Sequence, residues 1–569
     1  MQLNTTKDIS TRLWRDAFAA LLSAGLLWAT FPPVGVAWLV FVALAPILYV
    51  SRKATVKKSV AMWALCGFVF WFFDLSFFPV IRHHSASWGF VAAGWACGCL
   101  LGTAYFVLFG LLDAVLWRGV VINRNDCVYW RLIAILVFEP ILWAGVEWMR
   151  CTVTPGTSWN FLGTAMSQMP GLAYPARLGG VYLASSVALL INGVLLSLIN
   201  LLFVDSGHKR SWALEAVSGL VVALVICWIS SPSKVVRDQE TRPLRIAMIQ
   251  RNLPSGRTPL EHEKCDNPRA LYDELLDSVC KDGKIDLVVW PESALSEFGG
   301  DVRGRSAWVE AANVRNKTGG AALLAGGRSI TPTERGRRIQ NAAALYAIPE
   351  GMEDTLDTDG IPPRSHRPQV YVKRNLLPIG EYNPLAKWFP SLRDASFFVE
   401  APGNKVGIFH YRELNIAPLV CYDSVNPELS REAALNDAHM IVLISNDEWY
   451  EPSSHPMQHS WQVAARAIET GLPLIRVDNS GPTGVILPSG NSTWLTKGSS
   501  NRPLECAKGA LVETVQVPKS PVRTFYTTHG DRPLFYAFIV AIVAIILNVL
   551  DKTRNRQTIN PVYKEKELT

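Results

Sequence analysis

The stretch Leu419-Val420-Cys421-Tyr422-Asp423 decides how the soluble part of this chain folds. It ends an apolar run from Asn415 to Val420 that predicts a buried strand. Asn426-Pro427-Glu428 then predicts a helix start, with an N-cap residue, a proline in the first turn and an acid. A cysteine between a strand and a helix is a suitable nucleophile, because the strand fixes the sulfur and nearby N–H groups stabilise a thiolate. Buried structural cysteines are commoner than reactive ones, so Cys421 needs further support.

The composition is typical of an integral membrane protein with a soluble part. Of the 569 residues, 49% are hydrophobic, only 18% are charged and 20 are tryptophan. The net charge of +7 is modest, and many basic residues lie in short loops between apolar segments, so nucleic acid is not an expected partner. The ten cysteines have no CxxC or metal-ligand spacing, which predicts no zinc site or disulfide framework. Pairing among Cys265, Cys280 and Cys506 stays open.

Eight apolar segments predict membrane-spanning helices. The first follows Lys7, Arg12 and Arg15 and is similar to a signal peptide, but no clear small-residue cleavage site comes after it. We therefore expect an uncleaved first helix. The expected spans are 17–31, 34–50, 59–79, 88–117, 131–149, 181–204, 212–230 and 534–550.

The basic loop residues predict the orientation of the chain. They are concentrated after the second, fourth and sixth spans and in the C-terminal tail, all on the side of the N-terminus. Both termini are therefore expected in the cytoplasm and the soluble segment in the periplasm. The expected domains are a seven-helix membrane domain (1–231, with an outer loop at 151–180), a periplasmic domain (232–531), and an eighth helix with a cytoplasmic tail (532–569).

Four acids lie within or at the ends of these spans: Asp74, Asp113, Glu139 and Glu147. Buried acids are costly in lipid and usually face a bundle interior or a cavity. Glu147-Trp148-Met149-Arg150 closes the fifth span. We interpret it as an interfacial anchor, and the alternative is contact with a lipid headgroup.

Residues 241–520 alternate short apolar runs with helical patterns, which predicts a layered α/β domain. Residues 328–368, rich in Arg, Pro and Gly, are interpreted as a loop. The expected strands are 244–250, 285–290, 321–326, 369–372, 415–420, 440–445, 473–477 and 484–487. The expected helices are 261–281, 427–436 and 456–470.

Three of the apolar strands end in a reactive side chain. Glu292 follows Val288-Val289-Trp290-Pro291, Lys373 follows Val370-Tyr371-Val372, and Cys421 ends the third run. Together they suit acyl transfer: a carboxylate as general base and acid, a thiolate nucleophile, and an ammonium that depresses the thiol pKa and stabilises an oxyanion. Alone, each has a plainer explanation as a strand-end acid, a surface lysine or a core cysteine. Glu381, eight residues after Lys373, could likewise be a loop charge.

The order Glu, Lys, Cys on strand ends resembles the carbon–nitrogen hydrolase (nitrilase) superfamily. With membrane spans on both sides of the domain, the chain resembles the apolipoprotein N-acyltransferase family over residues 15–550. The matching phrases are Trp290-Pro291-Glu292, Lys373, Pro378-Ile379-Gly380-Glu381-Tyr382, Cys421-Tyr422, Ser445-Asn446-Asp447-Glu448-Trp449-Tyr450, Pro456-Met457-Gln458-His459, Arg466-Ala467-Ile468-Glu469 and Asn479-Ser480-Gly481, with Glu147-Trp148-Met149-Arg150 and Trp159-Asn160-Phe161-Leu162-Gly163 outside the domain.

The resemblance implies an αββα sandwich on about eight transmembrane helices. It also implies a ping-pong reaction in which Cys421 takes the sn-1 acyl chain of a phospholipid, typically phosphatidylethanolamine. The α-amine of an S-diacylglyceryl-cysteine at an apolipoprotein N-terminus then receives that chain, in the last step of bacterial lipoprotein maturation. Glu292 would act as base and acid and Lys373 would stabilise the oxyanion. No metal or organic cofactor is implied, and we expect a monomer in the inner membrane.

Four further residues are implied as supporting groups. Glu381 would hold Lys373 charged and oriented, and Tyr422, Asp423 and Trp449 would shape the pocket and the acyl channel. A loop after Glu381 is either a lipid-entry arm at the interface or ordinary core. Its aromatic residues are Trp388, Phe389, Phe397 and Phe398.

The chain departs from the family pattern at Asp423, where the family usually has Glu, and at Glu448, where a small residue is usual. Three alternative functions stay open. One is a membrane-tethered amidase or nitrilase with water as acceptor, and another is a paralogue that acylates a different amine. The third is a transporter or silent scaffold, which the buried acids Asp74 and Glu139 alone support.

Overall fold

The computed structural model forms two compact units, which we describe separately. One unit comprises residues 1–76, 95–231 and 531–569, and the other comprises residues 77–94 and 232–530. The structure describes residues 2–84, 87–121, 127–154, 157–204, 207–232, 239–253, 268–295, 301–333, 336–348, 355–363, 366–378, 380–383, 389, 401–497, 503 and 505–566.

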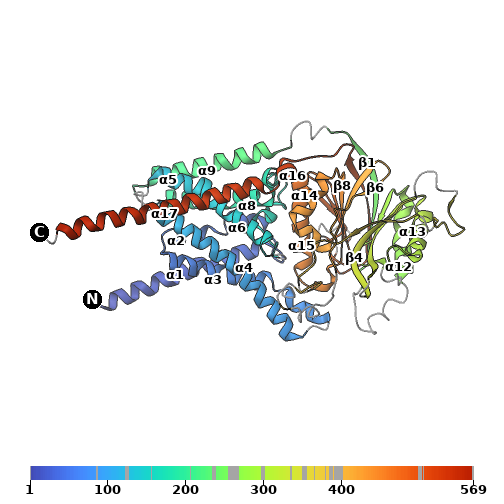
Figure 1. Ribbon diagram of the computed structural model, residues 1–569, viewed down its shortest axis with the longest axis horizontal. Coiled ribbons are helices and arrows are strands. Elements are labelled where there is room, and N and C mark those ends of the chain that lie inside the picture. The colour runs from blue at the N-terminus through green and yellow to red at the C-terminus, as the bar shows by residue number, and fades with distance from the viewer. Residues whose placement is uncertain are drawn as a thin grey trace. The chain divides into compact units, whose positions relative to one another are not determined.

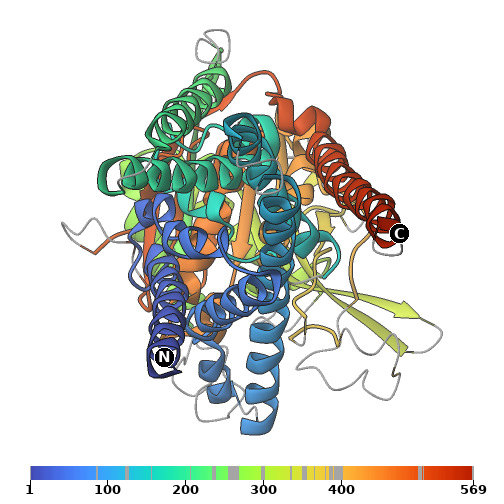
Figure 2. The ribbon, with the colours of Figure 1, turned by 90° about the vertical axis from the view of Figure 1, so that its left-hand side faces the viewer.

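The first unit is a bundle of long apolar helices (Figures 1 and 2). Within the described residues, six helical stretches are long and apolar enough to cross a membrane: Val56–Asp74, Trp88–Val121, Val128–Thr152, Ala176–Phe203, Lys209–Ser230 and Arg532–Asp551. They correspond to six of the eight expected spans, and the first expected span falls in α1. The helices are α1 (Gln2–Thr30), α2 (Ala45–Ser51), α3 (Val56–Asp74), α4 (Trp88–Leu116), α5 (Val128–Ile133), α6 (Glu139–Thr152), α7 (Leu162–Met166), α8 (Ala176–Phe203), α9 (Lys209–Ser230) and α17 (Arg532–Lys566).

The second expected span, at 34–50, is broken. A 3₁₀ helix, η1 (Ala37–Phe41), and the short helix α2 replace a continuous helix. The side-chain oxygen of Asn192 on α8 accepts hydrogen bonds from the backbone N–H groups of Leu44 and Ala45, at 2.8 and 3.0 Å. These donors lie at the start of a new helix, where N–H groups lack partners within the helix, although Ala45 also donates to the carbonyl of Val42 at 3.1 Å. Asn192 therefore stabilises the break.

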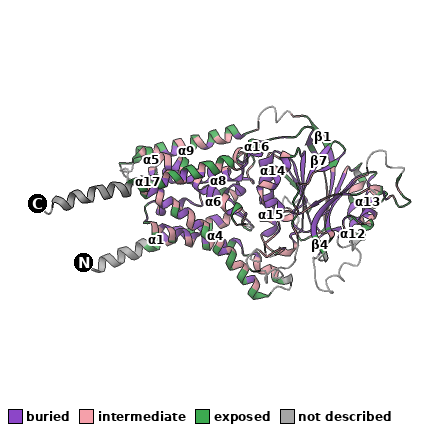
Figure 3. Ribbon diagram, in the orientation of Figure 1, coloured by how far each residue is buried: buried purple, intermediate pink, exposed green. Residues whose placement is uncertain are grey.

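Two helices of this unit, α9 and α17, expose rows of large apolar side chains. Exposed residues of the two helices are green in Figure 3. On α9 they include Val217, Val221 and Leu224, and on α17 Val540 and Leu547. Such rows are unfavourable in water and favourable in lipid hydrocarbon. The first unit is therefore the membrane domain.

Two buried acids of the bundle, Glu139 and Asp74, have hydrogen-bonding partners. Arg52 binds Glu139 through two hydrogen bonds of 2.9 and 2.5 Å, and the indole N–H of Trp117 also donates to Glu139. Asp74 accepts from the side-chain amide of Asn160 at 2.9 and 3.0 Å. The two acids that alone favoured a transporter thus have structural partners.

The second unit contains two six-stranded sheets, ordered β12-β1-β2-β3-β4-β5 and β11-β10-β9-β8-β7-β6. Strands β1, β2 and β3 pair in parallel, as do β7, β8 and β9, and the outer strands are antiparallel. The strands are β1 (Thr241–Gln250), β2 (Leu287–Val289), β3 (Ala322–Thr333), β4 (Gly336–Tyr346), β5 (Gln369–Val372), β6 (Phe409–Tyr411), β7 (Leu414–Val420), β8 (Met440–Ser445), β9 (Leu474–Asp478), β10 (Gly484–Ile486), β11 (Ser492–Trp494) and β12 (Gly509–Pro518).

Three apolar layers hold these sheets together. Alternate residues of the two sheets, such as Val289, Leu324, Val420 and Ile444, form the core between them. The opposite face of the first sheet packs against α12 (Pro268–Val279) and α13 (Arg305–Thr318), and that of the second against α14 (Pro427–Leu435) and α15 (His455–Thr470) (Figure 1). The remaining helix is α16 (Phe525–His529). This is the expected αββα sandwich.

The interpretation of 328–368 as a loop was wrong for its first half. Strands β3 and β4 pair from Leu323–Tyr346 out to Thr333–Gly336, a long antiparallel hairpin. Exposed side chains such as Arg337 and Arg338 lie on its strands, which explains why the composition suggested a loop. Strands β6, β11 and β12 and helix α13 were also not predicted.

Candidate active site

The three reactive residues each follow a strand of the sandwich. Glu292 comes three residues after β2 and Lys373 directly follows β5, both in the first sheet. Cys421 directly follows β7 of the second sheet. The thiol, the carboxyl and the ammonium interact electrostatically, so the fold brings all three together. The first sheet supplies Glu292 and Lys373 and the second supplies Cys421, so the site forms only when the two sheets pack together.

Cys421 occupies a strained turn between β7 and the short 3₁₀ helix η11 (Cys421–Val425). Its φ of 48° lies in the left-handed region, which is unfavourable for a residue with a Cβ. Ser293, next to Glu292, also has a positive φ of 61°. Such strain persists only where surrounding contacts impose it, and it is commonest at functional sites. Cys421 is partly exposed.

The carboxyl of Glu292 and the ammonium of Lys373 lie in a buried, hydrogen-bonded cluster. The Nζ of Lys373 is 4.0 Å from Oε1 of Glu292 and donates to Oε1 of Glu381 at 2.6 Å. The other oxygen of Glu381 accepts from the backbone N–H of Leu377 at 2.8 Å. Glu381 therefore holds Lys373 in place through an oriented ion pair.

Burial sets the acid–base properties of the site. It raises the pKa of Glu292 to about 7, with Lys373 opposing and Glu381 reinforcing the rise. Burial also raises the pKa of the Cys421 thiol, Glu292 adds to the rise, and Lys373 only partly offsets it. The contribution of Lys373 to the thiol pKa is downward, as expected, but burial and Glu292 outweigh it, so the net pKa is raised. Cys421 rests as a thiol, and a base poised near neutrality must take its proton.

Lys373 stays charged despite its burial. Burial alone would lower its pKa, but interaction with the ionised forms of Cys421, Glu381 and Glu292 raises it well above its usual range. A permanent buried cation beside the thiol can stabilise a thiolate or an oxyanion as negative charge develops.

Asp423 joins the cysteine turn to the lysine strand. Its buried carboxylate accepts hydrogen bonds from the hydroxyl of Tyr371 (2.9 Å) and the backbone N–H groups of Val420 (3.1 Å), Arg374 (3.1 Å) and Asn375 (2.7 Å). Four donors from β5, β7 and the residue pair after Lys373 thus converge on one side chain. The Asp423 side chain is one methylene shorter than the Glu of the family pattern, and its carboxylate is nevertheless fully hydrogen-bonded.

The structure also describes the remaining expected supporting residues, Tyr422 and Trp449. Tyr422 is buried, and its carbonyl accepts from the side chain of Asn375 at 2.8 Å. Trp449 and Glu448 lie partly exposed in the 3₁₀ helix η12 (Asp447–Tyr450). Within the aromatic loop, Phe389 is exposed. The other three aromatic residues, Trp388, Phe397 and Phe398, lie outside the described residues.

Two residues of the site were not identified from the sequence. The side-chain amide of Asn341 on β4 donates to Oε1 of Glu292 at 2.5 Å. Gly326 on β3 lies so close that a Cβ there would be 2.6 Å from Cα of Glu292. Both belong to the hairpin, and Asn341 lies in the segment interpreted as a loop, so no strand pattern pointed to it.

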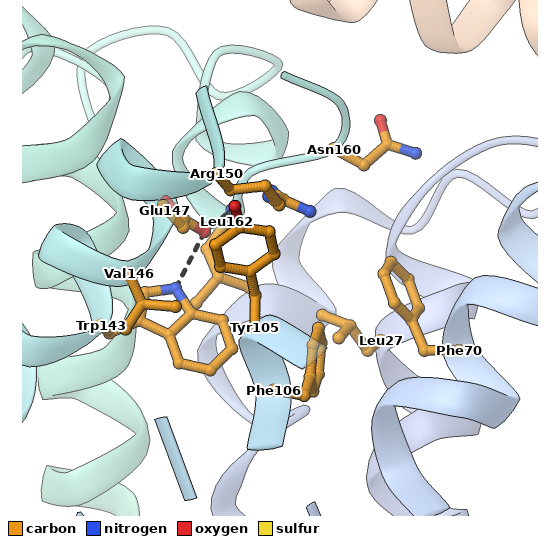
Figure 4. Close-up of a pocket in the computed structure, with 10 residues that line it drawn as sticks. All are labelled: Leu27, Phe70, Tyr105, Phe106, Trp143, Val146, Glu147, Arg150, Asn160 and Leu162. Carbon is orange, nitrogen blue, oxygen red and sulfur yellow. Dashed lines mark hydrogen bonds between the residues drawn. The ribbon is translucent and has the colours of Figure 1, made fainter. Parts of the chain in front are cut away.

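A small cavity lies within the membrane domain (Figure 4). Arg150, only 4% exposed, places its guanidinium 4.9 Å from the ring of Trp71 and 4.6 Å from that of Phe161. Glu147 accepts from Trp143 and from the backbone of Leu162. Both charged residues are buried and pack within the bundle, and their role as an interfacial anchor stays a prediction. The lining is Leu27, Phe70, Tyr105, Phe106, Trp143, Val146, Glu147, Arg150, Asn160 and Leu162.

Metal ligands and disulfides do not feature in the described part of the chain. Its His, Cys, Asp and Glu side chains form no cluster of three or more that could hold a metal ion. Cys280 and Cys506 are both free thiols there, and Cys265 lies outside it.

The αββα sandwich defines an enzyme domain of the carbon–nitrogen hydrolase type, here joined to membrane helices. Residues 245–495 match the family described as "Carbon-nitrogen hydrolase", and residues 23–194 match the family described as "Apolipoprotein N-acyltransferase N-terminal domain". The chain belongs to the apolipoprotein N-acyltransferase family and is a multi-pass membrane acyltransferase.

Several proteins named apolipoprotein N-acyltransferase are similar over most of the chain. That of Geobacter metallireducens is 26% identical over 484 residues, covering 85% of this chain and 87% of its own. That of Rhodopseudomonas palustris is 28% identical over 94% of this chain and 95% of its own, and that of Pseudomonas syringae pv. tomato 28% over 84% and 88%. Among solved structures, an amidase of the nitrilase superfamily from Nesterenkonia is 20% identical, with a TM-score of 0.33, over 52% of this chain and 96% of its own.

Proposed function

We propose that this enzyme transfers the sn-1 acyl chain of a phospholipid, typically phosphatidylethanolamine, to the α-amine of an S-diacylglyceryl-cysteine at an apolipoprotein N-terminus. The observation that carries the proposal is the convergence of Glu292, Lys373 and Cys421 within a domain that membrane helices anchor at both ends. The relatives named for this activity support the acceptor.

The first half-reaction forms a thioester on Cys421. Glu292 takes the thiol proton as the sulfur attacks the ester carbonyl of the phospholipid. Lys373 stabilises the negative oxygen of the tetrahedral intermediate. When the intermediate collapses, the bond to the glycerol oxygen breaks and Glu292 returns its proton to that oxygen, which releases a lysophospholipid. A pKa of about 7 lets Glu292 act in both directions near neutral pH.

The second half-reaction transfers the acyl chain to nitrogen. The acceptor amine attacks the thioester carbonyl, Lys373 again stabilises the oxyanion, and Glu292 accepts a proton from the attacking nitrogen. Collapse expels the Cys421 thiolate, which regains a proton from Glu292. The products are an amide and the free enzyme, so no cofactor is consumed.

The proposal includes the placement of the chain. The excess of basic residues in the loops on the N-terminal side supports cytoplasmic termini and a periplasmic catalytic domain. On this view 1–231 is the membrane domain, 232–531 the periplasmic domain and 532–569 the last helix with its tail. We propose that the enzyme acts as a monomer in the inner membrane, since one chain supplies the whole of the site.

Intact mass spectrometry tests the first half-reaction. The purified protein is incubated with phosphatidylethanolamine beside a Cys421→Ala variant. A gain of one acyl chain that the variant lacks, and that hydroxylamine releases, supports the thioester. Addition of a diacylglyceryl-cysteine peptide should then remove the chain from the protein. No adduct on folded protein with any of several phospholipids would refute the phospholipid-donor mechanism, and release of ammonia from small amides would favour an amidase.

A further inference from the structure

A buried chain of hydrogen bonds ends at the backbone carbonyl of Cys421. Asp447, at the start of η12, lies 3.0 Å from Nδ1 of His459 on α15. Nε2 of His459 lies 2.9 Å from the hydroxyl oxygen of Ser424, and that hydroxyl lies 2.8 Å from the carbonyl oxygen of Cys421. All three side chains are at most 1% exposed. The function proposed above uses none of them.

The direction of each hydrogen bond follows from the chemistry of its atoms. Burial would raise the pKa of Asp447, but the neighbouring His459 and Arg476 hold it far below its usual range, so Asp447 is a carboxylate and only accepts. Nδ1 of His459 must therefore carry a proton and donate to Asp447. Arg476 donates to the same carboxylate at 2.6 Å and also binds Asp478. These contacts fix Asp447, the end of the hydrogen-bond chain that is farther from Cys421.

Ser424 has one hydroxyl proton and two acceptors within reach. When Nε2 of His459 carries a proton, it donates to Ser424, and Ser424 donates to the carbonyl of Cys421. When Nε2 carries none, the Ser424 proton is drawn to the imidazole and the carbonyl loses that donor. The contact between Ser424 and Cys421 therefore depends on the imidazole.

This contact lies at a strained position. The backbone of Cys421 has a φ of 48°, and the direction of its side chain follows from that conformation. Asp423 holds the residue before it, through the N–H of Val420, and Ser424 holds the Cys421 carbonyl when Nε2 of His459 donates to the Ser424 hydroxyl. The two anchors flank the nucleophile, and loss of either allows the turn to relax.

Ser, His and Asp in this order also compose the triad of many hydrolases. Here Ser424 is fully buried, its hydroxyl faces the Cys421 carbonyl, and the reactive thiol lies three residues away. Ser424 therefore cannot contact a substrate, and the Ser424–His459–Asp447 hydrogen-bond chain acts through Cys421.

We propose that Ser424, His459 and Asp447 are positioning residues that hold the Cys421 backbone in its left-handed turn and so aim the thiol at the acyl carbonyl. This inference rests on Cys421 being the nucleophile of the proposed function. It predicts that disruption of this hydrogen-bond chain slows thioester formation and leaves phospholipid binding unchanged.

The test compares Ser424→Ala, Ser424→Thr and His459→Gln with a matched control, Ser460→Ala. Ser460 is equally buried on α15 and donates to the carbonyl of Met457 at 2.7 Å, away from the turn. The readouts are single-turnover thioester formation against phospholipid concentration, the rate of Cys421 alkylation by iodoacetamide, and thermal unfolding.

We expect Ser424→Ala and His459→Gln to slow thioester formation roughly 10- to 100-fold, as for small displacements of a reacting group, at unchanged half-saturating phospholipid. Alkylation should slow as well, Ser424→Thr should recover part of both rates, and Ser460→Ala should match the wild type. Unchanged rates in Ser424→Ala, or losses equal to those in Ser460→Ala, would overturn the proposal. Because alkylation needs no phospholipid, it still tests positioning if the wild type forms no thioester, which would refute the proposed function alone.

Discussion

Replacement of Glu381 by Gln removes the negative charge that lies beside Lys373 and near Glu292. The Nζ of Lys373 is 2.6 Å from one carboxylate and 4.0 Å from the other, so the two facing oxygens are at most about 6.6 Å apart. At an effective dielectric constant of about 20, two charges at this separation repel by about 2.5 kcal/mol. That corresponds to nearly two pH units in the pKa of Glu292.

The sign of the change follows from which form of Glu292 is destabilised. The charge of Glu381 disfavours the ionised form of Glu292 and helps raise its pKa to about 7. Without that charge the pKa of Glu292 falls, and the base is available at lower pH. The ascending limb of the pH–rate profile should therefore move about one to two units toward acid, while its plateau falls because Lys373 is less well held.

The assay is single-turnover thioester formation by mass spectrometry, measured across pH 4–9. Glu310→Gln is the control, since Glu310 is a buried acid on α13 in contact with Arg269 and outside the site. It should leave the profile unchanged. An ascending limb that stays in place or moves toward alkali in Glu381→Gln would refute the assignment of Glu292 as the base.

Three further substitutions test the geometry. Gly326→Ala places a Cβ 2.6 Å from Cα of Glu292, so thioester formation should fall about 100-fold, whereas Gly207→Ala, with nothing within 4 Å of its Cβ, should leave the rate unchanged. Asp423→Asn replaces one accepting oxygen with a donor and leaves two N–H or O–H groups unsatisfied, at a cost of about 1–3 kcal/mol each. Denaturant titration should therefore show a lower free energy of unfolding. A variant as stable as the wild type would contradict the four hydrogen bonds. Arg52→Met leaves Glu139 charged and buried, so the free energy of unfolding in detergent should fall by about 3–5 kcal/mol. Adding Glu139→Gln should recover part of this loss. A single variant as stable as the wild type would show that the ion pair is not formed.

The sequence was sufficient where local pattern and chemistry agree. The apolar run before Cys421 predicted β7, and Asn426-Pro427 predicted the start of α14, where the Asn426 side chain does accept from the N–H of Glu428. Glu292, Lys373 and Cys421 each follow a short strand, as the strand pattern predicted, and their catalytic roles stay a proposal.

Tertiary contacts decided what the sequence could not. The apolar run at 34–50 is long enough for a span, but Asn192, far along the chain, stabilises an interruption that the run itself does not predict. Likewise, Asn341 meets Glu292 because β4 pairs with β3 and β5, although its own segment is rich in charges and turn residues. The contact of Ser424 with His459 bridges 35 residues and depends on how α15 packs on its sheet.

The way the chain passes between the two units has a kinetic consequence. It crosses between them after Ser76, Gly94, Ser231 and Gly530, so the nitrilase-like unit is an insertion with four covalent attachments to the bundle. Such an enzyme meets lipids in two dimensions, where the relevant concentration is the number of lipid molecules per unit area. In mixed micelles its rate should follow the mole fraction of phospholipid and stay constant when micelles of fixed composition are diluted with buffer.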